Sequence, residues 1–351
     1  MEHFAKNQWY AAAWLTEIED KPFARRILDQ PLVFFRQGDG AIAALTDRCP
    51  HRLVPLSLGV VVDGNIRCGY HGMQFDGSGQ CVHIPAQTII PPKARTPSFP
   101  VCERYGLAWV WMGDPALADD AKVPVLESYG EPGWEVMEGG YQHHPSNYLN
   151  IVENLMDPSH TTFVHKQTIA DPSAEEEPVQ MERSDKHVVA FKWMRNAPAS
   201  QNDRRIHDWG DQRVDRGQFF YFFPPSVSRV DITVRPSEAD NSGEGPHLQT
   251  HSYKFLTPEG PNATHFFWLH LRNYKLGDQV WADRLRGILE FTYFEDRDIE
   301  MAMQRSQEET GVRSFAALEL DRAPMMAVRM IQQLIAAEAA ASEGVKEEAT
   351  A

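Results

Sequence analysis

Four potential metal ligands lie in the stretch CPHRLVPLSLGVVVDGNIRCGYHG, which runs from Cys49 to Gly72. Cys49 and His51 form one pair, and Cys68 and His71 form a second pair after sixteen intervening residues. Each pair therefore offers one thiolate and one imidazole. This alternation suits a two-iron, two-sulfide cluster in which one iron takes both thiolates and the other takes both imidazoles.

A structural zinc site is the alternative interpretation of these four residues. Zinc ligands are usually grouped as two cysteines followed by two histidines, or as four cysteines. The alternating order in this chain favours the iron–sulfur cluster. Gly69 and Gly72 permit tight loops with amides near the sulfides, and Tyr70 is placed to donate a hydrogen bond to the cluster.

A second group of chemically active residues lies in NIVENLMDPSHTTFVH: Asn154, Asp157, His160 and His165. In a regular α-helix, positions five apart diverge by about 140°, which is too far for two imidazoles to share one metal easily. Pro158 interrupts the helical hydrogen bonds, and a wide turn of π type would bring the two rings together. Two histidines and one carboxylate form the facial iron site of non-haem oxygenases. The carboxylate is either Asp157 or an acid elsewhere in the chain.

Composition and charge exclude several classes of partner. The chain has 351 residues and a net charge of −15, so its surface repels phosphate backbones and anionic lipids. We therefore expect neither a nucleic acid nor a membrane as a partner. No apolar run reaches the ~20 residues of a membrane span, and MEHFAKNQWY lacks the apolar region of a signal peptide. The remaining cysteines, Cys81 and Cys102, are isolated, which predicts a cytoplasmic protein without disulfides.

The pattern of turns and apolar residues divides the chain into regions. Residues 7–114 are predicted to form short strands, with hairpins in LVFFRQGDGAIAAL and QFDGSGQCVHI and a strand in GLAWVWMGD. Residues 115–146 have the composition of a connector. A helical segment follows from Asn147, and then come several strands rich in aromatic and β-branched residues. Helices are predicted over about residues 278–306 and 324–341, the second beginning at a proline.

With these motifs, the chain resembles the oxygenase component of Rieske non-haem iron oxygenases. It is most similar to the branch that contains vanillate O-demethylase, dicamba O-demethylase and toluenesulfonate methyl-monooxygenase. The resemblance covers nearly the whole chain and includes NQWYAAAW, both cysteine–histidine pairs, CERYGLAWVWMGDPALAD, NLMDPSHTTFVH, FLTPE and FEDRDIE. It implies an α+β fold: an all-β Rieske domain over residues 1–120, and a helix-grip-like catalytic domain of antiparallel sheet and helices over 121–341. Residues 342–351 are expected to be a disordered tail.

The resemblance also implies two metal cofactors and their ligands. The Rieske [2Fe-2S] cluster falls on the four residues of the first motif: Cys49, His51, Cys68 and His71. The mononuclear Fe(II) falls on His160 and His165, with a third ligand from a late helix. FEDRDIE puts that ligand at Asp296, with Asp298 as the competing carboxylate.

Asp157 and Asn154 are the predicted catalytic residues beside this iron. The resemblance gives Asp157 the role of a bridge between the two metal centres, accepting a hydrogen bond from His71 of a neighbouring chain. An Asp before a proline is also a common helix start, so capping is the alternative role. The resemblance implies a homotrimer in which the Rieske domain of one chain meets the catalytic domain of the next.

The implied function is that of a terminal oxygenase in a multicomponent monooxygenase. It would use O2 to hydroxylate a methyl or methoxyl group of an aromatic acid, and a hydroxylated methoxyl group decays to a phenol and formaldehyde. The sequence has no second cysteine cluster and no GxGxxG between a strand and a helix, so a separate ferredoxin-type reductase must deliver electrons from NADH or NADPH. Alternatives are hydroxylation of an aromatic ring or a benzylic methyl group, and a non-enzymatic electron carrier or zinc-binding module.

Three polar residues are predicted to contact the substrate: Lys254, His251 and Asp231, with Arg229 as a further candidate. In LQTHSYKFLTPE, strand alternation puts Ser252 and Lys254 on one face and His251 on the other. The resemblance places Lys254 near a substrate-contacting histidine of the dicamba enzymes. A cation there suits the carboxylate of an aromatic acid, although a lysine on a strand more often faces solvent.

Overall fold

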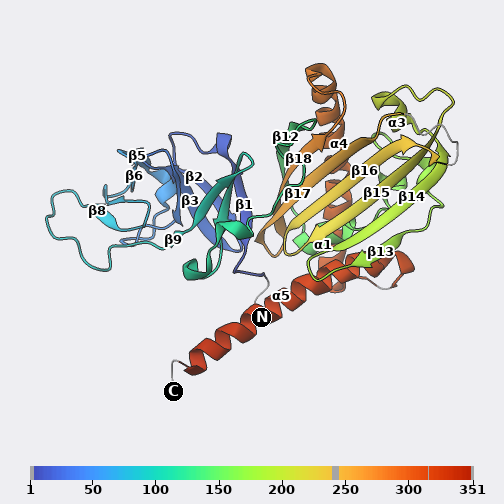
Figure 1. Ribbon diagram of the computed structural model, residues 1–351. Coiled ribbons are helices and arrows are strands. Elements are labelled where there is room, and N and C mark those ends of the chain that lie inside the picture. The colour runs from blue at the N-terminus through green and yellow to red at the C-terminus, as the bar shows by residue number, and fades with distance from the viewer. Residues whose placement is uncertain (1–3, 239–244, 315, 349–351) are drawn as a thin grey trace. The chain divides into compact units, whose positions relative to one another are not determined.

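The computed structural model describes residues 4–238, 245–314 and 316–348, which form two compact units (Figure 1). The first unit comprises Met1–Val123, Thr257–Pro261 and Ala337–Ala351, and the second comprises Pro124–Leu256 and Asn262–Ala336. The main boundary between them follows Val123. The later segments belong to the first unit through their hydrogen bonds: Glu338 accepts from the backbone amide of Lys6, and Pro258 accepts from that of Leu28.

The first unit is built from short antiparallel strands in three sheets. Its strands are β1 (Trp9–Trp14), β2 (Phe23–Ile27), β3 (Gln30–Arg36), β4 (Ile42–Thr46), β5 (Val60–Val62), β6 (Asn65–Arg67), β7 (Gln74–Phe75), β8 (Cys81–His83), β9 (Ser98–Phe99), β10 (Val101–Arg104) and β11 (Leu107–Trp111). The sheet orders are β1-β11-β10, β2-β3-β4-β9 and β5-β6-β7-β8. The pairs β3–β4 and β7–β8 confirm the two predicted hairpins.

A continuous apolar core joins two of these sheets. Phe35 and Leu45 from the β2-β3-β4-β9 sheet pack with Ile66 and Phe75 from the β5-β6-β7-β8 sheet, and all four are buried. Cys49 and Cys68 belong to the same core. The two buried cysteines therefore anchor the loops that carry both metal-binding pairs in the hydrophobic core.

The second unit is organised on one seven-stranded sheet (Figure 1). Its strands are β12 (Glu135–His144), β13 (Gln180–Arg183), β14 (Val188–Pro198), β15 (Arg213–Phe223), β16 (Val227–Pro236), β17 (Leu248–Gly260) and β18 (Ala263–Arg272), in the order β12-β18-β17-β16-β15-β14-β13. β12 corrects the prediction of a connector over 115–146. Gly139 and Gly140 interrupt the alternation of side chains that would identify this strand in the sequence. The pairing register with β18 shifts at the same point. A Cβ atom on Gly139 would lie 1.3 Å from the Trp268 carbonyl oxygen, so only glycine fits.

Five α-helices complete the described chain: α1 (Tyr148–Leu155), α2 (Thr161–Val164), α3 (Gln201–Ile206), α4 (Gln279–Thr310) and α5 (Arg322–Glu348). α4 agrees with the helix predicted from residue 278. Its N-cap Asp278 accepts a hydrogen bond from Trp281 N, and Gly311 ends it in the left-handed conformation. None of the described helices is both long and apolar enough to cross a membrane.

The helix α5 differs from the expected disordered tail over 342–351. It continues to Glu348, and residues 349–351 lie outside the described part of the chain. The helical part of this stretch, SEGVKEE, contains three glutamates and one lysine, which favour helix even without burial.

α4 and α1 lie on the same side of the seven-stranded sheet (Figure 1). The buried positions of α4 recur every three or four residues, which gives one continuous inward face: Leu289, Thr292, Tyr293, Asp296, Glu300 and Gln304. Asn150 on α1 donates hydrogen bonds to Gln304 and Gln307 on α4. The two helices are thus locked together, and the predicted α+β architecture with a large antiparallel sheet is confirmed.

Candidate active site and metal centres

The first metal-binding motif forms two loops at one end of the first unit. The backbone amide of Leu53 donates to the Cys49 carbonyl in one loop, and Gly72 N donates to the Cys68 carbonyl in the other. Gly72 has φ +74°, which a residue with a side chain rarely adopts. The two loops share this hydrogen-bonded turn, with the cysteine at its first position and the histidine at its third (His51) or fourth (His71).

The four side chains divide into a thiol pair and an imidazole pair. The Nδ1 atoms of His51 and His71 lie 3.2 Å apart, so both rings aim at one point. Burial and the electrostatic effect of Cys68 raise the pKa of the Cys49 thiol, and both cysteines lie in one buried core. A cluster with two thiolates on one iron and two imidazoles on the other requires this separation into like pairs. The donor set therefore fits the Rieske cluster.

Burial differs between the two pairs. Cys49 and Cys68 are buried, whereas His51 and His71 are exposed at the surface. Burial raises the pKa of the Cys49 thiol to about 11, so this thiol ionises only when a metal replaces its proton. Tyr70 packs its exposed ring against His71, with 3.8 Å between ring centroids. The imidazole end of the site is therefore the end that a partner can reach.

The second motif brings three potential ligands together in the second unit: His160, His165 and Asp296. His160 Nε2 lies 3.4 Å from Asp296 Oδ1, and His165 Nε2 lies 3.2 Å from the same oxygen. Adjacent ligands on an ion with bonds of about 2.1 Å lie about 3 Å apart. Two imidazoles and one carboxylate at this spacing fit a facial iron site, with the other positions left for oxygen and substrate.

The chain brings the two histidines together by breaking the helix. α1 ends at Leu155, and α2 begins only at Thr161, after a turn that contains Pro158. His160 is the N-cap of α2, and His165 is its C-cap with non-helical dihedral angles. This break replaces the wide π-type turn expected from the sequence. Pro158 accounts for the break before His160, because proline removes a backbone donor and cannot continue the helix, and the end of α2 at Val164 frees His165 from helical geometry.

Helix phase selects Asp296 over Asp298 as the third ligand. Asp296 follows the buried residues Thr292 and Tyr293 by four and three positions, so it shares their inward face. Asp298 lies two positions further, about 200° around the helix. Its side chain is 73% exposed and lies 3.6 Å from Arg297, as expected for a solvated helix face.

Neighbouring polar groups orient the three ligands. Glu295 Oε2 lies 3.0 Å from His165 Nδ1 and also accepts from the Thr168 hydroxyl at 2.7 Å. A carboxylate on one ring nitrogen fixes the tautomer, so that the Nε2 lone pair points to the metal. Asn154 Nδ2 donates to Asp296 Oδ1 at 3.2 Å and holds that carboxylate from the α1 side.

The electrostatics of the three ligands follow from their contacts. Burial raises the pKa of Asp296, but hydrogen bonds from His160 and His165 outweigh it and hold the pKa well below its usual range. Burial lowers the pKa of His160, but Asp296 outweighs it, so the pKa lies above the ordinary value. The site therefore concentrates a negative charge between two imidazoles, which is the arrangement that attracts a divalent cation.

Asp157 lies in the turn between α1 and α2. Its Oδ1 accepts a hydrogen bond from Ser159 N at 2.8 Å and from the Ser159 hydroxyl. Asp157 thus stabilises the turn that carries His160, although the N-cap of α2 is His160 itself. This hydrogen bonding resembles the helix-capping role considered above. The role of Asp157 in electron transfer remains a proposal.

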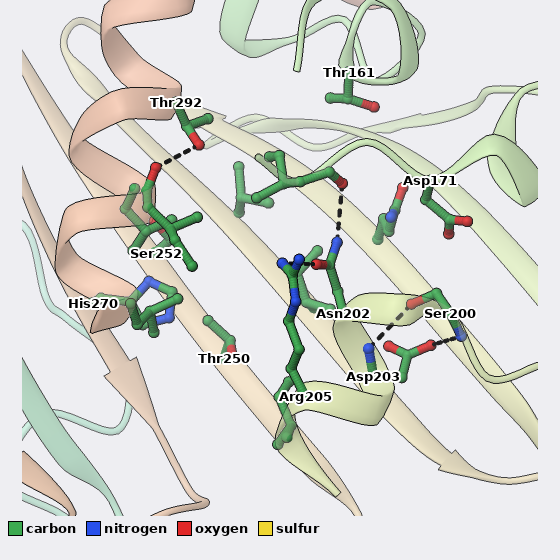
Figure 2. Close-up of a pocket in the computed structure, with 18 of the residues that line it drawn as sticks. Thr161, Asp171, Ser200, Asn202, Asp203, Arg205, Thr250, Ser252, His270 and Thr292 are labelled. Atoms are coloured by element: carbon green, nitrogen blue, oxygen red, sulfur yellow. Dashed lines mark hydrogen bonds between the residues drawn. The ribbon is translucent and has the colours of Figure 1, made fainter. Parts of the chain in front are cut away.

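A cavity of about 360 Å³ extends from these ligands between the sheet and the helices of the second unit. His160 and Asp296 line it together with apolar side chains such as Leu155, Phe220 and Ile288. Figure 2 shows its strand side, with Thr250, Ser252 and His270, and its α3 side, with Asn202 and Arg205. Lining residues alternate along three adjacent strands: Arg216, Gln218 and Phe220 on β15, Val230 and Ile232 on β16, and Thr250, Ser252 and Lys254 on β17. A cavity of this size holds one substituted aromatic ring.

The three predicted substrate-binding residues do not share one environment. Lys254 lines the cavity, whereas His251 and Asp231 are not among its lining residues. His251 Nδ1 lies 2.6 Å from Asp231 Oδ1, and its ring stacks on Trp134 at 4.6 Å between centroids. The difference follows from strand alternation, because residues 251 and 254 point to opposite faces of the sheet. Arg229 joins the His251 group, 3.1 Å from Asp231.

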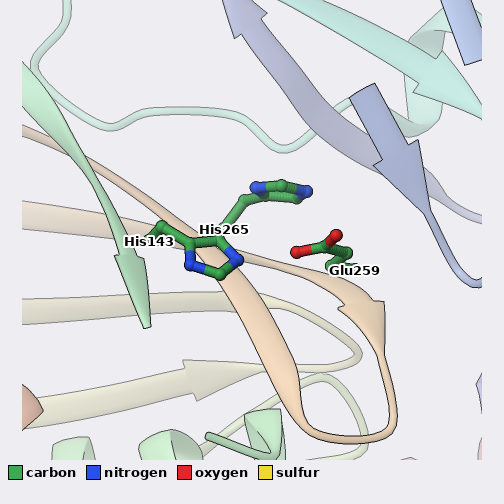
Figure 3. Close-up of side chains that lie close together, drawn as sticks. All are labelled: His143, Glu259 and His265. Atoms are coloured by element: carbon green, nitrogen blue, oxygen red, sulfur yellow. The ribbon is translucent and has the colours of Figure 1, made fainter. Parts of the chain in front are cut away.

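A further pair of imidazoles lies across β12 and β18. His143 and His265, drawn in Figure 3, are register partners with ring centroids 5.7 Å apart. The Tyr141 hydroxyl lies 2.9 Å from His265 Nδ1. Glu259, also labelled in the figure, belongs to the first unit. We therefore assign no metal to this group.

Two functional candidates were missed from the sequence. Glu295 stands in the acidic run FEDRDIE, where its neighbours Asp296 and Asp298 were the obvious ligands. A carboxylate next to a ligand in such a run is a usable signal for a residue that orients an imidazole. His270, which lines the cavity, sits in the aromatic strand THFFWLHLRNY and has no local motif that distinguishes it from a core residue.

Comparison with known families agrees with both halves of the molecule. Residues 8–100 match the Rieske [2Fe-2S] domain, and residues 145–337 match the vanillate O-demethylase oxygenase C-terminal domain. The first match contains all four cluster ligands. The second contains His160, His165 and Asp296.

Curated relatives match over nearly their full length. The chain is 35% identical to the oxygenase component of dicamba O-demethylase from Stenotrophomonas maltophilia, covering 96% of this chain and 99% of the relative. It is 34% identical to the vanillate O-demethylase oxygenase subunit of a Pseudomonas species, covering 97% of both chains. It is 32% identical to the iron–sulfur subunit of the toluene-4-sulfonate monooxygenase system of Comamonas testosteroni, covering 95% and 98%.

Solved structures give the same relationship. Dicamba monooxygenase bound to 3,6-dichlorosalicylic acid superposes with a TM-score of 0.86 at 34% identity, covering 96% of this chain and 99% of that one. A dicamba monooxygenase structure with non-haem iron and dicamba matches with a TM-score of 0.80 over the same shares. The cluster ligands, the iron-binding triad and these matches leave no support for a zinc module or an electron carrier. The chain belongs to the Rieske non-haem iron oxygenases, as an oxygenase component with a [2Fe-2S] cluster and a mononuclear iron.

Proposed function

We propose that this oxygenase hydroxylates a methyl or methoxyl group of an aromatic acid, as a vanillate-like O-demethylase that releases formaldehyde. The observation that carries the proposal is the cavity itself. Two of the three candidate iron ligands, His160 and Asp296, line it together with apolar side chains, and the buried side chain of Lys254 lies on its strand side. Relatives named for vanillate and dicamba demethylation support the same substrate class.

Lys254 is suited to bind the acid group. Its side chain is buried, its Nζ donates to the Ser252 carbonyl at 3.3 Å, and it lies 5.7 Å from the centre of the Tyr293 ring. An ammonium has three donors, so a substrate carboxylate or sulfonate accepts from those not directed at Ser252. An anchored acid group holds the ring in place and leaves its methyl or methoxyl substituent to be presented to the iron site.

The residues of the site hold and shield the reacting group. When bound, the two metal centres supply electron transfer and oxygen activation. Glu295 and Asn154 keep His165 and Asp296 aimed at the iron, and the apolar wall excludes water from the reacting carbon. One atom of O2 is inserted into a methoxyl C–H bond, which gives a hemiacetal. Two electrons and two protons reduce the other oxygen atom to water. The hemiacetal then releases formaldehyde and leaves a phenol.

We infer that electrons come from a separate ferredoxin-type reductase that oxidises NADH or NADPH. Multicomponent relatives support a separate electron-delivering partner. We also propose a homotrimer, in which the exposed His71 of one chain meets Asp157 of the next. The exposed imidazole end of the cluster supports this arrangement. The cytoplasmic location stays a prediction.

The proposed reaction is tested by a substrate screen. The oxygenase is incubated with a generic reductase, NADH and methoxylated benzoates, and formaldehyde is measured. Formaldehyde in proportion to NADH consumed is the expected result. A hydroxylated product that retains its methoxyl group would instead favour hydroxylation of the ring or of a benzylic methyl group.

The cluster assignment predicts the effect of His71→Cys. A third thiolate in place of a neutral imidazole adds negative charge to the cluster, so the cluster potential should fall by roughly 200 mV or more. Redox titration followed by electron paramagnetic resonance measures it. The control is His83→Cys, because His83 is an exposed residue of β8 in the same unit and should leave the potential unchanged. An unchanged potential in His71→Cys would contradict its role as a ligand.

The role of Lys254 predicts a pH dependence of binding. Burial lowers the pKa of Lys254 to about 7, against the attraction of Asp296 and Asp231. Benzoates stay ionised in this range, so only the protonated lysine attracts them. We expect 3-methoxybenzoate to bind more weakly as the pH rises above this pKa, by up to about tenfold per pH unit.

Isothermal titration calorimetry of the oxygenase without reductase measures this dependence. The neutral 3-methoxybenzamide should bind with little change over the same pH range, and Lys254→Met should remove the dependence for the acid. Equal pH profiles for the acid and the amide would show that Lys254 does not bind the carboxylate.

A further inference from the structure

His270 is a polar group of the cavity that the proposed function does not use. It lies on β18, lines the cavity, and is only 5% exposed (Figure 2). Neither Nδ1 nor Nε2 has a hydrogen-bond partner within the described protein. Buried side-chain nitrogens almost always have a partner, because leaving them unpaired costs about 1–3 kcal/mol. A histidine kept in this state at a binding cavity points to a ligand group that completes its hydrogen bonds.

The hydroxyl groups on this side of the cavity are already engaged. The Thr250 hydroxyl lies 2.8 Å from the Tyr274 hydroxyl, and the Ser252 hydroxyl lies 3.2 Å from that of Tyr293. The Thr292 hydroxyl donates to the backbone carbonyl of its own helix at 2.9 Å. Compared with Thr250, Ser252 and Thr292, His270 is therefore the lining residue whose polar atoms are still available to form hydrogen bonds with a ligand.

The surroundings of His270 determine what kind of group it binds. Burial lowers its pKa to about 3, and the positive charges of Lys254 and Arg272 act in the same direction. The imidazole is thus neutral, with one N–H donor and one acceptor nitrogen. A carboxylate only accepts hydrogen bonds, so it can pair with the N–H of such a ring but not with its acceptor nitrogen. A hydroxyl group both donates and accepts, so it can pair with either nitrogen.

We propose that His270 binds a hydroxyl group on the ring of the substrate while Lys254 binds its acid group, so that this one side chain sets the preference for a ring hydroxyl. This inference rests on the proposed function and narrows its substrate class. His270 acts as a specificity-determining residue, because a site that leaves its polar group unpaired rejects an analogue without the hydroxyl.

The test compares ligands that differ by one hydroxyl. Dissociation constants are measured by calorimetry on the full-length oxygenase, without reductase and without oxygen, for 3-methoxybenzoate and its 2-, 4- and 5-hydroxy derivatives. At least one derivative should bind the parent protein about tenfold more tightly than 3-methoxybenzoate. His270→Leu should reduce that preference to within about twofold while keeping affinity for 3-methoxybenzoate, because leucine fills the space without a polar atom.

Two further variants separate hydrogen bonding from general damage. His270→Gln retains a donor and an acceptor and should keep most of the preference. Thr292→Val, at a lining hydroxyl that is already engaged by its own helix, should keep all of it. Rieske absorption and thermal melting confirm that each variant is folded.

The outcomes distinguish this inference from the proposed function. If 3-methoxybenzoate binds but no hydroxylated derivative is preferred, or if the preference survives in His270→Leu, the role of His270 is wrong and the proposed function stands. If no methoxybenzoate binds the parent protein, the proposed substrate class fails, and the role of His270 fails with it.

Discussion

His160→Ala and His165→Ala oxygenases are each expected to lose about one of three irons per chain and all turnover, while the visible absorption of the Rieske cluster is retained. Each variant removes one ligand from a set of three whose donor atoms lie within 4.8 Å of one another. The cluster ligands lie in the other unit and are untouched. Iron analysis and absorption spectra of the purified proteins measure the two centres separately.

The matched pair Asp296→Asn and Asp298→Asn tests the carboxylate ligand. Only Asp296→Asn should lose the mononuclear iron, because Asp296 faces both histidines and the side chain of Asp298 is 73% exposed. His207→Ala, an exposed histidine beyond α3, is the control for histidine removal in general. Iron content of three per chain in His160→Ala would place the mononuclear site elsewhere.

Asp157→Asn is expected to leave both metal centres bound and the cluster reducible, yet to lower turnover by about a hundredfold or more. Asparagine keeps the size of the side chain and its ability to accept from Ser159, but it removes the charge. The loss would thus report on the proposed link between Asp157 and a cluster imidazole. Stopped-flow reduction of the cluster, followed by single-turnover product analysis, separates cluster reduction from oxygenation.

Ser159→Ala is the control for the local role of Asp157. This variant removes the hydroxyl that donates to Asp157 Oδ1 and keeps the backbone hydrogen bond from Ser159 N. If Asp157 serves only to stabilise the turn, both variants should have similarly small effects. Turnover of Asp157→Asn within a few-fold of the parent would show that its charge is not needed for electron transfer.

Much of the fold follows from local sequence signals. The Gly-Asp-Gly turn between β3 and β4 and the alternation of the catalytic strands predict paired strands without any long-range information. The failures occur where local signals mislead. Gly139 and Gly140 disguise β12 as part of a connector, because their role is to let the strand approach the Trp268 backbone. The charged end of α5 resembles a tail, although its residues favour helix.

The candidate metal ligands stand out in the sequence because their types and spacing suit metal binding. His51 and His71 each follow a cysteine within a short loop, and His160 and His165 follow Pro158 and flank the short helix α2. Asp296 required the phase of α4, which the sequence left undecided against Asp298. His251 and Lys254 show the same limit, since strand alternation separates them but does not say which face meets the cavity.

Contacts between distant segments were beyond the sequence. Glu295 matters because His165 lies 130 residues away in the chain and only 3.0 Å away in space. His270 matters because the rest of the cavity wall satisfies its own hydroxyls and leaves this ring unpaired. Such properties depend on which groups are buried together, and that is decided only when the sheet and α4 pack.

The alternating cavity wall has a consequence for how this enzyme acquires new substrates. The candidate iron ligands come from the two ends of α2 and from α4, whereas eight lining side chains come from alternate positions of β15, β16 and β17. Natural selection can therefore exchange these strand positions without disturbing the catalytic centre, since the intervening residues keep the sheet intact. A mutant library restricted to these positions is the smallest one that samples new substrate preferences while preserving the oxidation chemistry.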